Sequence, residues 1–176
     1  DLEYPAFSRK MCRLLRDLKS EGKSIFQIEP YLETLISIHE FFAEGHRPAE
    51  LKKDSLQYPV YLAEKNATGA LLAFYRTVMT GSFEETIEAV RNFARLDAAR
   101  FRLRDSLRAQ SLAPLLDNVR SAYIEAGVSH FYLSQSLRKR LSRPHRLKTI
   151  FLSDDALKAI NLKGNLYGPG DLLTFF

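Results

Sequence analysis

The residues best suited to chemistry are the cations of the segment 137–148, LRKRLSRPHRLK. The segment contains no acidic residue, and its members are Arg138, Lys139, Arg140, Arg143, His145, Arg146 and Lys148. Clustered cations near serine and aromatic side chains, here Phe131 and Tyr132, suit contacts with phosphate groups. Cations are also favoured at the C-terminus of a helix, where they complement its dipole. The pattern therefore leaves two interpretations open, an anion-binding site and a solvated basic loop.

Catalytic and metal-binding chemistry has little support in the sequence. The four histidines and the single cysteine are scattered, at His39, His46, His130, His145 and Cys12. None of these residues has metal-ligand spacing from another, and the glycines of 164–170 match neither a Walker loop nor a dinucleotide-binding fingerprint. Ser153 precedes Asp154 and Asp155, so helix capping explains this acidic pair. We expect no catalytic residue, no metal, no cofactor and no enzymatic activity of the chain's own.

The charge of the chain is unevenly placed. The net charge is +5, with −2 over residues 1–97 and +7 over residues 98–176. This asymmetry indicates a basic half able to contact nucleic acid, anionic lipid or an acidic protein. No apolar run approaches the roughly 18 residues of a membrane span, so we expect none. One cysteine, Cys12, cannot form an internal disulfide, and we expect a buried thiol in an intracellular, reducing compartment, cytoplasm or nucleus.

The element expected to position these cations is a long helix over residues 82–109. Ser82 and Glu85 have the spacing of a capping box, which marks the start of a helix. Arg100, Arg104 and Arg108 recur every four residues and therefore form one edge of the helix. Either their stems cover apolar surface on a solvated helix, or they offer a cationic edge to an anionic partner.

Shorter helices are expected on either side of this long helix. Their ranges, bounded by glycine, proline and capping residues, are about 5–21, 28–44, 67–80, 111–126 and 129–141. Residues 149–152 and 172–176 are typical of short strands, separated by a helical turn and a glycine-rich turn. The fold class is therefore mainly α, a multi-helix bundle around one long central helix with a small C-terminal α+β end. That end has a winged-helix-like outline.

We expect a helical body over residues 1–128 and a basic, strand-containing segment over residues 129–176, packed as one unit. The favoured function is a non-enzymatic protein-interaction or scaffold domain of a larger assembly, whose basic C-terminal half contacts an anionic partner. The alternative is a nucleic-acid-binding module that uses the cations of 138–148 together with Arg100, Arg104 and Arg108. One continuous cationic face would favour nucleic acid, whereas arginines paired with glutamates would favour a protein partner.

Overall fold

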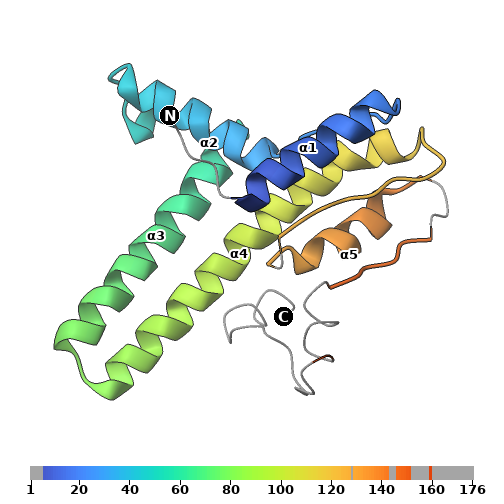
Figure 1. Cartoon of the computed structure of the whole chain (residues 1–176). Coiled ribbons are helices and arrows are strands. Elements are labelled where there is room, and N and C mark those ends of the chain that lie inside the picture. Colours follow the sequence, from blue (N-terminus) through green and yellow to red (C-terminus); the bar gives the residue numbers. More distant parts are fainter. Residues whose placement is uncertain (1–5, 128, 143–145, 152–158, 160–176) are drawn as a thin grey trace.

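The chain forms a mainly helical structure, shown as a computed structural model in Figure 1. The structure describes residues 6–127, 129–142, 146–151 and 159. Its helices are α1 (Ala6–Ser20), α2 (Pro30–Ala43), α3 (Gln57–Thr80), α4 (Phe83–Leu116) and α5 (Phe131–Arg140), with a 3-10 turn, η1, at Pro48–Glu50. No strand occurs within these described ranges. The predicted mainly helical fold class is therefore confirmed.

The long helix α4 is the central element of the fold. It packs against α2, α3 and α5, and Figure 1 shows its N-terminal half projecting from the other helices together with α3 as an antiparallel hairpin. We call this hairpin the arm. Small buried residues, Ala67 and Ala70 on α3 and Ala98 on α4, allow the two helices to approach closely. Gly81 makes the turn, because a Cβ there would lie 2.7 Å from Cγ2 of Thr77.

Two apolar clusters flank the C-terminal half of α4. One joins α4 to α5 through Ala109, Leu112, Leu116, Leu133 and Leu137. The other joins α2 to α3 through Tyr31, Ile38 and Val60, with Leu103 and Leu107 of α4 packed against it. The body of the molecule is therefore built around one half of α4, and the arm is the other half.

The start of α4 is as predicted, but its end is not. Glu85 donates its backbone N–H to the Ser82 hydroxyl at 3.2 Å, and Ser82 donates its N–H to the Glu85 carboxylate at 2.7 Å. The helix then continues through Pro114 to Leu116, so the separate helix predicted from Ser111 is wrong. Proline removes only one backbone hydrogen bond near the helix end, and burial of Leu112 and Leu116 against α5 outweighs that loss.

Other predicted boundaries also differ. Helix α3 begins at Gln57, because Pro59 is tolerated in a first helical turn. Residues 119–127, predicted to belong to a helix over 111–126, are not helical, and Tyr123 is 83% exposed. Residues 149–151 form no strand. The remaining residues of the predicted α+β end, from Leu152 onward, lie outside the described residues except position 159, and the division at residue 128 stays a prediction.

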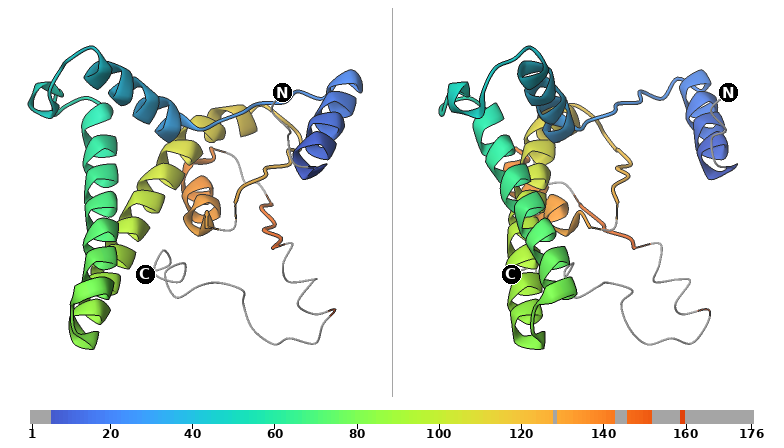
Figure 2. Two further views of the ribbon diagram at one scale, coloured as in Figure 1. Left: turned by 60° about the vertical axis from the view of Figure 1, so that its left-hand side comes forward. Right: turned by 90° about the vertical axis from the view of Figure 1, so that its left-hand side faces the viewer.

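Helix α1 has no extensive packing contact with another described helix. Figure 2 shows it apart from the others in both views, joined to α2 by the segment 21–29. Its Cys12, predicted to be a buried thiol, is exposed because no other helix covers this side of α1. Gly22, predicted to stop the helix, has a φ of +79° that suits glycine.

Candidate interaction surfaces and a buried ionic network

The arginine edge of α4 faces the body of the protein instead of solvent. Arg100, Arg104 and Arg108 each pair with a carboxylate of the same chain. Their side chains are 29%, 24% and 11% exposed. The structure thus brings these three predicted anion-binding residues together, but with partners that already neutralise them.

Glu64 of α3 is the centre of the first part of this network. It accepts hydrogen bonds from Nη1 of Arg100, at 3.1 and 3.2 Å, and from the hydroxyl of Tyr31 at 3.1 Å. Arg100 also donates to Asp97 at 2.6 Å. Burial raises the pKa of Tyr31 above its ordinary value, and the Glu64 carboxylate adds to this effect. Burial alone would lower the pKa of Arg100, but Asp97 and Glu64 outweigh it and raise that pKa.

Glu29, immediately before α2, is the centre of the second part. Its carboxylate accepts a bidentate pair of hydrogen bonds from Arg104, with Nε–Oε1 and Nη2–Oε2 distances of 3.0 and 2.8 Å. Arg108 donates to the same carboxylate. The Glu29 side chain is only 14% exposed. Bidentate arginine–carboxylate pairs fix geometry as well as charge, and this pair locks the start of α2 to the middle of α4.

A buried histidine–aspartate pair fixes the start of α5. Nδ1 of His130 lies 2.5 Å from Oδ1 of Asp105, and their side chains are 6% and 1% exposed. Among the described residues, Oδ2 of Asp105 and Nε of Arg108 have no hydrogen-bond partner. Burial lowers the pKa of Arg108. The pair resembles the base and orienting group of a catalytic site, but nothing exposes it to a substrate.

The basic segment of 138–148 is only partly free. Arg140 donates to the hydroxyls of Ser136 and Ser106, both at 2.8 Å, and therefore tethers α5 to α4. Arg138 donates to the backbone carbonyl of Leu147 at 3.4 Å. The exposed cations are Arg138, Lys139, Arg140, Arg146 and Lys148. Arg143 and His145 lie outside the described residues.

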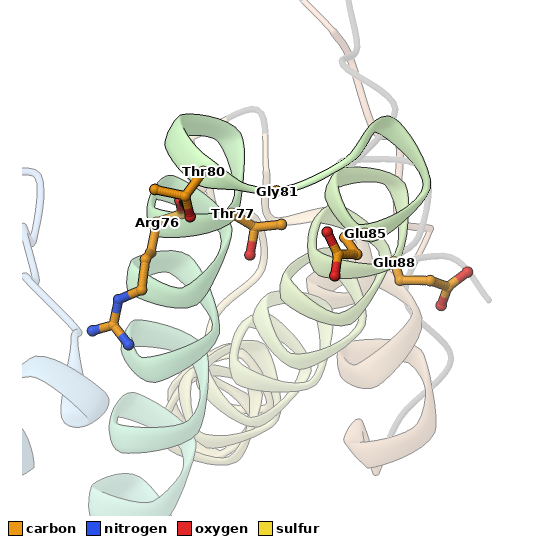
Figure 3. A pocket seen from close by; sticks show the side chains of 6 residues that line it. All are labelled: Arg76, Thr77, Thr80, Gly81, Glu85 and Glu88. Atoms are coloured by element: carbon orange, nitrogen blue, oxygen red, sulfur yellow. Dashed lines mark hydrogen bonds between the residues drawn. The ribbon is translucent and has the colours of Figure 1, made fainter.

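The distal end of the arm carries a group of exposed apolar side chains, which we call the arm tip. Its members are Leu72, Tyr75, Val78, Met79 and Phe83, with exposed fractions of 58%, 56%, 51%, 82% and 74%. A shallow pocket lies at the turn of the hairpin, lined in part by Arg76, Gly81 and Glu85 (Figure 3). Glu85 points from α4 toward α3 in this view, while Arg76 is directed away. The Glu85 carboxylate is engaged in capping α4, so the apolar residues are the more prominent feature.

The described residues form neither a metal-binding group nor a membrane-spanning helix. In the described part of the chain, no three His, Cys, Asp or Glu side chains are grouped closely enough to hold a metal ion. None of the helices found there combines the length and apolar composition needed to cross a bilayer.

Comparison with known proteins shows that the chain is similar to a protein of unknown function. The chain is 30% identical over 135 residues to an uncharacterized protein of Archaeoglobus fulgidus. The match covers 77% of this chain but 43% of that protein, so the chain spans less than half the length of this relative. No family model matches the chain, and no solved structure matches it significantly.

Proposed function

We propose that this chain is a non-enzymatic protein-interaction domain, a scaffold whose contact surface is the arm tip. The observation that carries the proposal is the gathering of five large apolar side chains, each more than half exposed, at one end of a projecting hairpin. Large apolar side chains exposed close together mark surfaces that another protein covers. Leu72, Tyr75 and Met79 recur at helical spacing on α3, and Phe83 follows across the turn. The arm tip would bind an apolar surface on a partner protein.

The ionic network supports a protein partner over nucleic acid. Arg100, Arg104 and Arg108 hold Glu64 and Glu29, so the body does not present them as a cationic face. The side chains of the Asp105–His130 pair are almost fully buried, so we assign this pair a structural role. A reducing intracellular compartment is part of the proposal, since the single cysteine is free and exposed.

Site-specific photocrosslinking in cells that produce the protein tests this proposal. A benzophenone side chain replaces Met79 in one variant and Arg91, an exposed position on the outside of the arm, in the control. We expect a discrete protein adduct at position 79 that is absent at position 91 and is lost when Tyr75→Ser and Phe83→Ser are added. Equal labelling at both positions, or no adduct at position 79, would contradict the assignment of the tip.

The second candidate function is a nucleic-acid-binding module, which one observation favours. Lys139, Arg146 and Lys148 are exposed on α5 and on the segment that follows it, where each is free to approach a phosphate group. The predicted winged-helix-like end belongs to this alternative.

A further inference from the structure

Helix α1 is strongly amphipathic, yet no other helix covers it. Its apolar side consists of Met11, Leu14, Leu15 and Leu18, and Leu14 is 52% exposed. Its cations are Arg9, Lys10, Arg13, Arg16 and Lys19, against one acidic residue, Asp17. Most helical stability in proteins comes from packing an apolar face, so this helix needs a partner of complementary chemistry.

A groove lies between α1 and the extended segment that follows it. Three apolar side chains line it, Leu15, Ile25 and Phe26, and the last two are 42% and 63% exposed. Three cations, Arg16, Lys19 and Lys23, line it as well. The groove therefore suits a helix whose exposed face combines apolar and acidic side chains.

The outer face of α2 has this complementary composition. Leu32 and Ile36 are 40% and 57% exposed, and Glu33, Glu40 and Glu44 are exposed beside them. No lysine or arginine occurs on α2. The lengths also match, because α1 has 15 residues and α2 has 14.

We propose that α2 of a second copy of this chain docks into the α1 groove. Docking within one chain is disfavoured by the anchoring of the linker. Ile28 packs on the cluster between α4 and α5, and Arg104 and Arg108 hold Glu29. The end of segment 21–29 next to α2 is therefore held against α4. Figure 2 shows the rest of this segment running away from α2 to α1, which lies at a distance from it.

If each of two copies docks its α2 into the α1 groove of the other, the assembly is complete as a dimer. Each copy offers one α1 groove and one α2 face, so a two-fold dimer satisfies both without leaving a free end. The contact lies at the opposite end of the molecule from the arm tip. The inference is therefore independent of the proposed function.

Charge reversal combined with mixing tests the dimer. We expect sedimentation equilibrium to give twice the chain mass of 20.2 kDa, and weaker association at about 500 mM than at about 50 mM salt. The variant Arg16→Glu/Lys19→Glu and the variant Glu33→Lys/Glu40→Lys are each expected to be monomeric. An equimolar mixture of the two is expected to dimerise, because every reversed helix then meets a reversed partner.

A thiol placed on α2 separates the two-copy contact from one within a single chain. Ile36→Cys adds a thiol opposite the native Cys12, which lines the groove. On mild oxidation we expect a covalent dimer on a non-reducing gel, and none for Tyr123→Cys, which places the new thiol at an exposed position that does not line the groove. A monomer with an internal disulfide would overturn the proposal in favour of self-docking.

Two further outcomes overturn the proposal. One is a wild-type chain that stays monomeric at every concentration while cosedimenting with phosphatidylserine vesicles, which would assign α1 to a membrane surface. The other is a dimer that neither charge reversal weakens. Arg91→Glu/Arg95→Glu on the arm is the matched control, and Met79→Ser is expected to leave the dimer intact even if the proposed function of the tip fails.

Discussion

His130, at the start of α5, lies with its Nδ1 2.5 Å from Oδ1 of Asp105 in the middle of α4. The two residues are 25 positions apart in the sequence, and both side chains are buried. This hydrogen bond, together with the hydroxyl contacts of Arg140, fixes where α5 meets α4.

Removing His130 and Asp105 together is expected to destabilise the protein by less than the two single removals added together. His130→Ala leaves the Asp105 carboxylate buried without any partner, at a cost of about 2–3 kcal/mol in the free energy of unfolding. Asp105→Ala/His130→Ala is expected to cost less than the sum of the two single changes. Urea unfolding of the four proteins measures this coupling. Additive losses would show that the hydrogen bond contributes nothing.

Glu29→Gln is expected to destabilise the protein by about 3 kcal/mol, because it leaves Arg104 and Arg108 partly buried without a counter-charge. Glu33→Gln, one turn further along and exposed, is the matched control and is expected to change stability by less than about 0.5 kcal/mol. Thermal and urea unfolding compare the two variants. Equal effects would mean that the network around Glu29 does not hold α2 in place.

Tyr31 is expected to make stability depend on alkaline pH. Its pKa is raised above the ordinary value of 10.0 by burial and by Glu64, so the folded protein holds this proton more tightly than the unfolded chain. The contribution of this proton to the free energy of unfolding is fully present below pH 10 and is lost as the pH rises above 10. Tyr31→Phe, which removes the hydrogen bond to Glu64, is expected to lower the free energy of unfolding by about 1–2 kcal/mol at pH 8.

That deficit is expected to shrink at pH 11, because phenylalanine has no proton to lose. Urea unfolding at the two pH values measures the change. Tyr123→Phe, at an 83% exposed position, is the control and is expected to have no effect at either pH. A deficit for Tyr31→Phe that grows with pH would contradict the assigned direction.

Titration with mixed-sequence DNA and RNA at two salt concentrations separates the proposed function from its alternative. If the chain is a protein-interaction domain, we expect only nonspecific binding, with a Kd of about 10⁻⁴ M or weaker at physiological salt. If it binds nucleic acid through the basic segment, Arg146→Gln/Lys148→Gln will flatten the salt dependence by about two units of slope. Lys52→Gln/Lys53→Gln removes the same charge from another exposed site and is the control. Tight binding that only the first variant weakens would favour the nucleic-acid function.

The sequence identified local features of α4 well. Ser82 and Glu85 predict its start, because a capping box is a contact between near neighbours. Its end was missed because Pro114 is a local signal for a boundary, whereas the burial of Leu112 and Leu116 that overrides it comes from α5. Similarly, Cys12 lies on a helix with an apolar face, and only the tertiary structure shows that nothing covers that helix.

The role of the arginine edge depends on distance along the chain. The spacing of Arg100, Arg104 and Arg108 correctly places them on one side of a helix, but spacing does not identify what they face. Arg104 meets Glu29 across 75 positions, and Arg100 meets Glu64 across 36. Glu29, immediately before Pro30, is only a weak signal for a buried ion pair, because a glutamate at this position is equally compatible with a solvated helix terminus.

Helix α4 is continuous from the arm tip into the body, so it fixes the distance between the two. Phe83 at the tip and Arg108 in the body are 25 positions apart on one helix, which corresponds to about 37 Å at the usual rise per residue. A protein held at the tip is therefore kept at a set distance from the body, and at a set angle around the helix axis, because each residue also contributes a fixed rotation. Shortening or lengthening the arm would change both quantities together, so the arm defines the spacing and the orientation of whatever it joins.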